Sequence, residues 1–220
     1  MAVDFPQNYS VLLSGPPGVG KFEYCLSLVK SWLDAGERVV YITSERSPVE
    51  IKSFASRLGL SLEGHEDGGS LVFVDCYSWN MGKSYEKGFT IKNAANVNEI
   101  NITLEKVMEK IGNPARIVFD SLSPLFLYND VQTMTKFFHF LTSNAKTKYG
   151  FIIYTLQEGV HDPKIRNTLI YLVDGYMEMQ FGEDSDVLTR KLRVHHLKGV
   201  SADTSWKNFM VGEKGFEMRS

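Results

Sequence analysis

Short apolar runs alternate along the first 155 residues with segments whose apolar side chains recur at helical spacing. The runs predict five β-strands, at residues 9–14, 38–43, 71–75, 115–120 and 151–155. The helical spacing predicts four α-helices, at residues 23–35, 48–58, 98–111 and 131–148. Continuous apolar strands separated by helices are typical of a parallel sheet covered on both faces. The pattern therefore predicts an α/β fold.

The pattern changes after Asp174, where the apolar runs become shorter and turns separate them. Strands are predicted at residues 176–181, 191–197, 206–211 and 216–218, with Gly212-Glu213-Lys214-Gly215 as a hairpin connection between the last two. We expect these strands to extend the same sheet in antiparallel fashion. The polar residues 79–96 are predicted to form a mobile loop. Because no linker-like segment divides the chain, residues 1–220 are expected to form one domain.

Composition narrows the class of protein. The chain has 220 residues, is 43% hydrophobic and carries a net charge of −2, so it lacks the basic excess that duplex nucleic acid usually attracts. It has neither an apolar run long enough to span a membrane nor a secretory leader at its start, so we expect a soluble, cytoplasmic protein with no membrane partner. Cys25 and Cys76 lack metal-ligand spacing and are expected to be buried, reduced thiols.

The turn between the first predicted strand and the first predicted helix carries the strongest chemical signal. It reads Gly15-Pro16-Pro17-Gly18-Val19-Gly20-Lys21-Phe22 and matches the phosphate-binding loop pattern G-x-x-x-x-G-K-[ST] except at its last position. Glycines let successive backbone N–H groups curve around phosphates, and the lysine reaches the β- and γ-phosphates. The following helix directs the positive end of its dipole toward them. We therefore expect a bound nucleotide, and an ordinary glycine-rich turn is the alternative.

Phe22 is the exception to the loop pattern. The Ser or Thr at this position normally gives its hydroxyl to Mg²⁺, and a phenyl ring cannot ligate a hard cation. The metal is therefore absent, displaced, or held by phosphates, waters and other carboxylates. The sequence predicts nucleotide binding and leaves both magnesium binding and hydrolysis open.

Several polar residues follow predicted strands and are candidates for the rest of a nucleotide site. Asp120 ends an apolar strand, where such proteins hold a metal through water, and Asp75 is a rival because it also ends an apolar strand. Glu45 follows the second strand and could orient or deprotonate an attacking water. Gln157 follows the strand at 151–155 and could sense a γ-phosphate.

Taken together, these pieces resemble a single KaiC-like domain of the RecA superfamily of P-loop ATPases, which also includes the archaeal RadA relatives. The resemblance covers most of the chain and is carried by residues 13–21, 40–48, 72–78, 117–123, 173–175 and 196–199. It implies a RecA-like fold with a mostly parallel sheet, flanking helices and a C-terminal antiparallel extension. It also implies an assembly, a ring or filament with nucleotide between subunits.

The departures from the family pattern are as informative as the matches. Members usually carry two adjacent glutamates after the second strand, one of them the catalytic base; here Glu45 matches the first and Arg46 replaces the second. Members also supply a Lys and an Arg from a late strand to the neighbouring subunit's phosphates. The corresponding positions here are His196 and Lys198. Only Lys198 is expected to be charged near neutral pH.

Three hypotheses follow. The first is an ATP- or ADP-binding module with weak or lost hydrolysis that serves as a regulator in signal transduction or as a scaffold, binding copies of itself or a partner protein. The second is an active Mg²⁺-dependent ATPase in which Lys21, Glu45 and Asp120 suffice. The third is a recombinase-like DNA-binding protein that uses Lys83, Lys87, Lys92 and the region 161–166. Solvated loop charge explains those cations better, given the net charge, so nucleic acid is not the expected partner.

Overall fold

A mixed β-sheet organises the part of the chain that the structure, a computed structural model, describes: residues 5–184, 187–213 and 215–219. The strand order in this sheet is β10-β9-β8-β7-β1-β6-β5-β2-β3-β4. Seven strands are mutually parallel: β1 (Tyr9–Gly15), β2 (Val39–Thr43), β3 (Leu71–Asp75), β4 (Phe89–Thr90), β5 (Ala115–Asp120), β6 (Gly150–Gln157) and β7 (Gly175–Asp184). The other three run antiparallel to their neighbours: β8 (Val187–Leu197), β9 (Lys207–Gly212) and β10 (Gly215–Met218).

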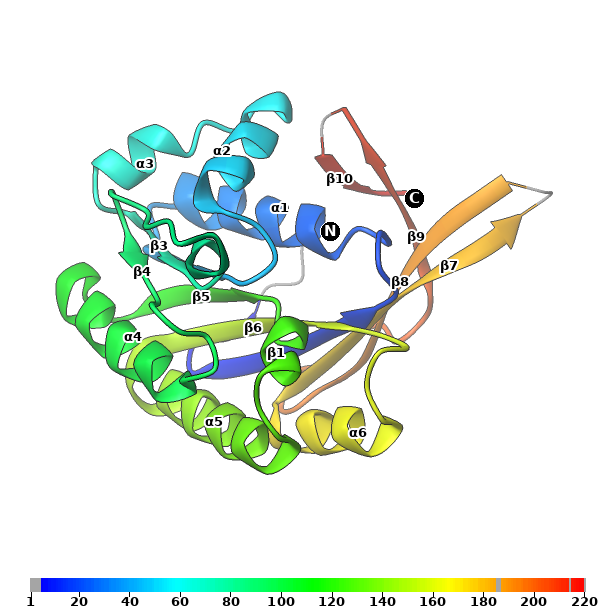
Figure 1. Cartoon of the computed structure of the whole chain (residues 1–220). Helices are drawn as coiled ribbons and strands as arrows, with labels where there is room; N and C mark the ends of the chain where they lie inside the picture. The colour runs from blue at the N-terminus through cyan, green and yellow to red at the C-terminus, as the bar shows by residue number, and fades with distance from the viewer. Residues whose placement is uncertain (1–4, 185–186, 214, 220) are drawn as a thin grey trace.

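Helices cover both faces of the parallel part of the sheet (Figure 1). On one face lie α1 (Lys21–Asp34), α2 (Pro48–Arg57) and the short α3 (Glu63–Asp67). On the other lie α4 (Val97–Ile111), α5 (Val131–Asn144) and α6 (Pro163–Leu172). Their starts follow local chemistry: Ser47 and Glu50 form a capping box at the start of α2, and the carboxylates of Asp130 and Asp162 cap α5 and α6.

The apolar core is divided by the sheet into two clusters. One contains the inward side chains of α4 and α5, such as Leu104 and Phe138, and the other contains those of α1, such as Leu26 and Val29. Strands β1, β2, β3 and β5 are buried at every residue, as expected for a sheet covered on both faces. This confirms the predicted α/β architecture. It also leaves the carboxyl ends of the central strands as the edge where side chains from several strands meet.

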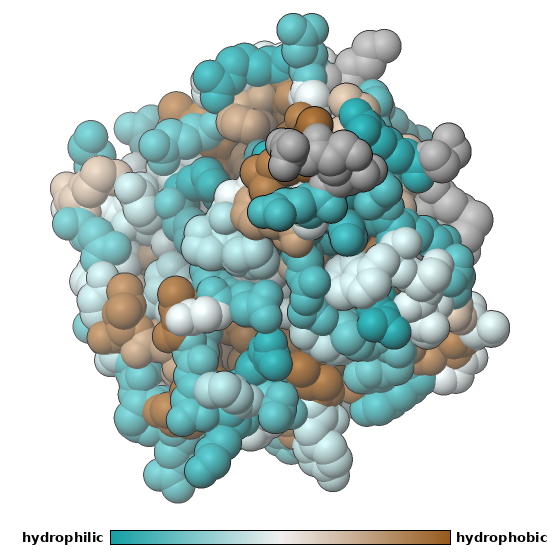
Figure 2. All heavy atoms as spheres, turned by 90° about the vertical axis from the view of Figure 1, so that its right-hand side faces the viewer, coloured by the Kyte–Doolittle hydropathy of each residue, from teal (hydrophilic) through white to brown (hydrophobic). Residues whose placement is uncertain are grey.

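The antiparallel extension differs from the central sheet in having one wetter face. Burial along β8 is partial and uneven, with Leu192, Val194 and Leu197 as its buried positions. Figure 2 shows the end of the molecule that carries these strands as mainly hydrophilic, with its apolar atoms in small separate groups. The extension therefore behaves as an antiparallel sheet with one solvated side, and it confirms the antiparallel strands predicted at 191–197, 206–211 and 216–218. The prediction was wrong for the strand at 176–181, because β7 pairs parallel to β1 and belongs to the parallel part of the sheet. Lys214, in the predicted hairpin connection, lies outside the described residues.

Three local predictions were incomplete. Residues 79–96 are not a plain loop, because a 3-10 helix (Ser78–Met81) starts this segment. Strand β4, which lies within the segment, pairs with β3. The helix predicted at 131–148 ends as α-helix at Asn144 and continues as a π-helical turn to Tyr149. The region 161–166, considered as a DNA loop, instead opens α6, with Pro163 in its first turn.

Candidate functional site

The predicted phosphate-binding loop lies between β1 and α1, at the carboxyl edge of the sheet. Gly18 and Gly20 have φ angles of 76° and 120°, which side-chain-bearing residues rarely adopt. Helix α1 begins at Lys21, and Gly20 before it provides no side-chain cap for the first backbone N–H groups. The loop therefore presents a helix start whose amides are not satisfied by a capping side chain, which is what an anion requires.

Strands β7 and β9 pack directly against this loop. A Cβ atom added to Gly15 would lie 2.7 Å from the carbonyl oxygen of Met179 on β7. A Cβ atom added to Gly20 would lie 3.0 Å from Val211 and 3.1 Å from Phe209, both on β9. These two glycines are therefore required for close packing. The sequence gives no signal for Met179, Phe209 and Val211, because nothing in a local pattern links a late strand to an early loop.

Lys21 is buried within the loop, with 5% of its surface exposed. Its Nζ donates hydrogen bonds to the carbonyl oxygens of Gly15 at 2.6 Å and Pro16 at 2.9 Å, and to Oε1 of Gln157 at 2.8 Å. Burial lowers the pKa of Lys21 to about 8, and the nearby carboxylates of Glu45 and Asp120 limit the fall. An arriving phosphate would offer this ammonium group an anionic partner in place of neutral ones.

Gln157 connects the lysine to a carboxylate. It lies directly beside Gly15 in the β1–β6 register, and its Nε2 donates a hydrogen bond of 2.9 Å to Oε1 of Glu45. The structure thus brings Lys21, Gln157 and Glu45, which the sequence identified separately, into one hydrogen-bonded chain. Their predicted roles as phosphate ligand, sensor and water-orienting residue remain predictions.

Asp120 lies near this chain, at the end of β5 and one strand away from β1. Its Oδ1 accepts a hydrogen bond from the hydroxyl of Thr155 at 2.6 Å, and its Oδ2 accepts one from the hydroxyl of Tyr41 at 3.0 Å. Burial raises the pKa of this carboxyl above its usual value. Strand alternation could have indicated Thr155, which faces the same side of β6 as Gln157, whereas Tyr41 required the strand order.

Asp75, the rival to Asp120, has a different environment. Strands β6, β5 and β2 separate β3 from β1. Oδ1 of Asp75 accepts hydrogen bonds from the backbone N–H groups of Tyr77 and Ser78, both at 2.9 Å. Its carboxylate therefore closes the turn that follows its own strand and lies away from the loop.

Phe22 occupies the position at which the loop pattern has a hydroxyl. Its ring is 6% exposed and packs edge-on against Phe54 of α2, with ring centroids 5.0 Å apart. The guanidinium carbon of Arg46 lies 4.3 Å from the centre of the Phe22 ring. The Nη1 atom of Arg46 is 3.9 Å from Oε2 of Glu45 and 3.9 Å from Oδ2 of Asp120. The two departures from the family pattern, at positions 22 and 46, are therefore in contact.

Lys198 lies at the opposite end of the sheet from the loop, whereas His196 pairs with Tyr176 of β7, level with the middle of β1. The hydroxyl of Tyr9, the first residue of β1, donates to the backbone carbonyl of Lys198 at 3.0 Å, and Nζ of Lys198 donates to the carbonyl of Val173 at 2.6 Å. Since β1 spans seven residues, roughly 20 Å separates this end from the loop. Burial, with the charge of Lys198, lowers the pKa of His196 below its usual value. Lys198 therefore does not reach the loop of its own subunit.

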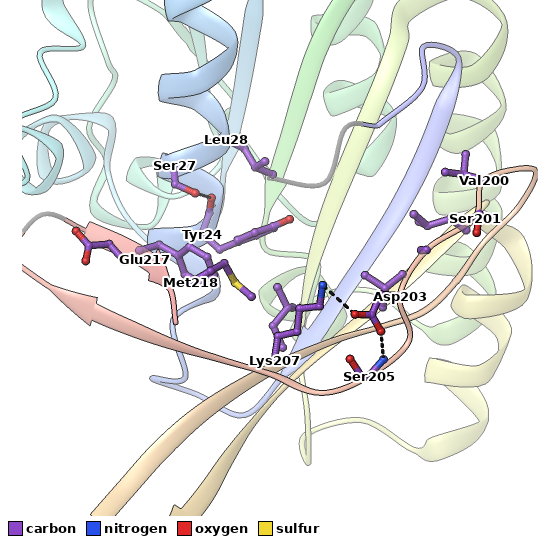
Figure 3. Close-up of a pocket in the computed structure, with 15 residues that line it drawn as sticks. Tyr24, Ser27, Leu28, Val200, Ser201, Asp203, Ser205, Lys207, Glu217 and Met218 are labelled. Atoms are coloured by element: carbon purple, nitrogen blue, oxygen red, sulfur yellow. Dashed lines mark hydrogen bonds and ion pairs between the residues drawn. The ribbon is translucent and has the colours of Figure 1, made fainter. Parts of the chain in front are cut away.

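Two cavities differ in their relation to the candidate site. The larger, of about 1000 Å³, lies between α1 and strands β8–β10 and contains none of the predicted site residues (Figure 3). Its walls combine Tyr24 and Leu28 of α1 with Met218 of β10, and an ion pair between Lys207 and Asp203 lies at its side. The smaller, of about 410 Å³, borders Glu45 and includes Trp79 and Tyr128 in its lining. Only the smaller one adjoins the candidate site.

The fold and this loop define a nucleotide-binding domain of the RecA type. The family model for the KaiC ATPases matches residues 3–219, and the chain belongs to that family. This confirms the resemblance inferred from the sequence.

Individual relatives agree with this assignment. A UPF0273 protein of Pyrococcus horikoshii is 26% identical over 216 residues, covering 96% of this chain and 85% of the relative. A UPF0273 protein of Thermotoga maritima is 24% identical over 215 residues, covering 96% of this chain and 87% of the relative. The crystal structure of a KaiC-like protein of P. horikoshii superposes with a TM-score of 0.78 at 17% identity, covering 98% of this chain and 91% of that one, and shows the shared fold.

Proposed function

We propose that this chain is an ATP- or ADP-binding member of the KaiC family in which hydrolysis is weak or lost, and that it acts as a regulator or scaffold. The loop from Gly15 to Phe22 would hold the phosphates through its backbone amides and Lys21. Glu45 would orient water, and Gln157 would sense the γ-phosphate, to whatever extent catalysis survives.

The observation that carries the loss of hydrolysis is the Phe22 ring at the position of the hydroxyl ligand. Phosphoryl transfer depends almost entirely on positioning and on neutralisation of charge, so removing a metal ligand costs orders of magnitude in rate. The ring is buried against Phe54, so water has no room to take the place of the hydroxyl. Arg46, where the family pattern has a second glutamate, removes a further catalytic carboxylate.

The test is steady-state phosphate release from ATP by the purified chain, with Lys21→Ala as the control for contaminating ATPases. We expect turnover far below about 1 s⁻¹, the low end of ordinary enzyme rates, while calorimetry shows that ATP and ADP bind. Turnover near that rate that disappears in Lys21→Ala would reject the proposal.

Turnover that disappears in Lys21→Ala would support the second candidate function, an active ATPase. One observation favours this alternative: Glu45 is held at 2.9 Å by Gln157, which in turn contacts Lys21, so a carboxylate already lies beside the phosphate-binding lysine. Glu45→Gln would then reduce turnover without abolishing nucleotide binding, which separates a role in positioning water from a role in binding.

We further propose that subunits assemble head to tail, with Lys198 contributing to the phosphates of a neighbour. The placement of Lys198 at the far end of β1 supports this, because it cannot act within its own subunit. In a mixture, Lys21→Ala subunits would lack a working loop and Lys198→Ala subunits would lack the donated lysine. Mixing them should restore tight ADP binding at the junctions where a sound loop meets a sound lysine. Binding no better than that of the separate variants would contradict the assembly.

DNA binding has little support in the described residues. Two of the cations considered for it are paired, Lys87 with Asp67 at 2.8 Å and Arg166 with Glu158 at 3.0 Å. Salt-sensitive binding of single-stranded DNA would be needed to revive it. In the described part of the chain, no helix is both long and apolar enough to cross a membrane.

A further inference from the structure

The residues around the loop do not fit a resident Mg²⁺. This ion prefers oxygen ligands in octahedral geometry, and the loop supplies a phenyl ring at the position of its hydroxyl ligand. Both oxygens of the Asp120 carboxylate accept hydrogen bonds from buried hydroxyls, those of Thr155 and Tyr41. No group of three or more His, Cys, Asp or Glu side chains suited to a metal occurs among the described residues. The disagreement between this donor set and a P-loop metal site needs a physical explanation.

Arg46 provides one, because its guanidinium lies where a cation beside Asp120 is wanted. Its Nη1 lies 3.9 Å from the carboxylates of both Glu45 and Asp120, and its guanidinium carbon lies over the ring of Phe22. The hydroxyl of Thr43 donates to the backbone carbonyl of Arg46 at 2.7 Å, which fixes the turn that places it. The side chain remains 40% exposed, so part of the guanidinium is open to a ligand.

The Phe22 ring thus has a use that the loop pattern does not suggest. An aromatic face attracts a guanidinium, and the attraction grows as water is excluded. A threonine at position 22 would offer Arg46 no such surface. A guanidinium binds phosphate oxygens through two parallel N–H groups, whereas a lysine acts as a point charge. Arg46 and Phe22 together therefore place a cationic hydrogen-bond donor for phosphate next to the loop.

We infer that Arg46, held on Phe22, takes the place of Mg²⁺ and that the site binds metal-free nucleoside di- and triphosphates. This rests on the proposed nucleotide binding at the loop and specifies its ligand. The guanidinium would contact the terminal phosphate while Lys21 contacts the phosphates within the loop. A magnesium ion chelated by the same phosphates would be repelled by the guanidinium, so excess Mg²⁺ should weaken binding.

The test is calorimetric titration of the full chain with ADP and ATP, in excess EDTA and in excess MgCl₂. We expect the wild type to bind at least as tightly in EDTA as in MgCl₂. Arg46→Gln should bind about tenfold to a hundredfold more weakly in EDTA, the loss expected for a charged hydrogen bond. Arg57→Gln is the matched control, because Arg57 also lies over an aromatic ring. Its guanidinium carbon is 5.1 Å from the ring centre of Phe54, and both residues are on α2. It should bind like the wild type.

A double variant, Phe22→Thr with Arg46→Glu, tests the dependence in the other direction. It replaces the ring with a hydroxyl and the cation with a carboxylate, both of them oxygen ligands, and should bind nucleotide more tightly with Mg²⁺ than without it. Circular dichroism of each variant checks that it is folded, and Arg46→Lys, which keeps the charge, should retain more affinity in EDTA than Arg46→Gln.

The outcomes separate this inference from the proposed function. If the wild type binds no nucleotide in either condition, the proposed function fails. If it binds only with Mg²⁺, or if folded Arg46→Gln binds as well as Arg57→Gln in EDTA, nucleotide binding survives and the inference about Arg46 is overturned.

Discussion

Strands β3 and β5 both end in an aspartate after a run of apolar residues, but the two carboxylates have different surroundings. Asp75 accepts hydrogen bonds from two backbone amides of the turn that follows it. Asp120 accepts hydrogen bonds from side chains of two neighbouring strands and faces Arg46. Similar local sequence therefore leads to a local role in one case and to a shared site in the other. The difference is set by strand order, since one strand separates β5 from β1 and three separate β3 from it.

The largest expected effect concerns the lysine on the Asp120 side of this comparison. Lys21→Ala removes the ammonium group that contacts the loop carbonyls and Gln157, and we expect ADP affinity to fall by about a hundredfold or more. Lys52→Ala removes a cation on the Asp75 side, where Lys52 pairs with Glu66, and should leave affinity unchanged. Isothermal titration calorimetry measures both. Equal losses of affinity would mean that the carboxyl ends of β5 and β3 do not differ in their contribution to nucleotide binding.

Stability should distinguish the two aspartates directly. Asp120→Ala leaves the buried hydroxyls of Tyr41 and Thr155 without their acceptor, which costs about 2–6 kcal/mol at about 1–3 kcal/mol per group. Asp75→Ala removes a cap on two turn amides, which costs about 1–2 kcal/mol. Urea unfolding followed by circular dichroism gives both free energies. A larger loss at Asp75 would contradict the assignment of its carboxylate to a local turn.

The pH dependence of nucleotide affinity gives a third test. Because burial holds the pKa of free Lys21 near 8, binding a polyanion above that pH requires uptake of a proton. Affinity should therefore be flat below pH 7 and fall toward tenfold per pH unit above pH 8, with the linkage of one proton.

Two further variants connect this profile to the comparison. The charge of Asp120 raises the pKa of Lys21, so Asp120→Asn should move the fall in affinity to lower pH, whereas Asp75→Asn should leave it in place. Fluorescence or calorimetric titrations from pH 6 to pH 9.5 would measure the midpoint, roughly bracketing the value expected for this group. A profile flat to the upper limit would show that Lys21 keeps an ordinary pKa.

The smallest effect is expected from Phe22→Thr alone. It restores the loop hydroxyl on the Asp120 side but leaves Arg46 in place, so we expect only a severalfold gain in Mg²⁺-dependent nucleotide affinity, below the loss expected for a whole charged hydrogen bond. Parallel titrations with and without the metal give the ratio. An unchanged ratio would place the side chain at position 22 outside the metal's reach.

Much of the fold was predictable, because its elements are coded locally. Alternating apolar runs and helical repeats predicted every buried central strand, and the shift after Asp174 predicted the antiparallel part. The helix α6 was missed because only Ile165, Leu169 and their neighbours give it a short apolar stripe next to a polar turn. The π-helical end of α5 was missed because its residues continue the helical pattern.

The candidate site residues could be proposed one by one from the sequence, but their arrangement could not. The loop motif identified Lys21, and strand ends identified Glu45, Asp120 and Gln157. The hydrogen bonds among them depend on β6 and β5 lying in order beside β1, which no local pattern states. The contact between Phe22 and Arg46 was out of reach for the same reason, because it joins the start of one helix to the turn before the next.

The packing of Gly20 against Phe209 also bears on the order in which the protein can mature during translation. The loop between β1 and α1 is synthesised well before β9, the strand that packs against it, because β2 to β8 come between them in the chain. A nascent chain in which β9 has not yet been synthesised contains the whole loop motif but lacks Phe209 and Val211, which pack against Gly20. The proposed nucleotide site is then structurally complete only after β9 has been synthesised.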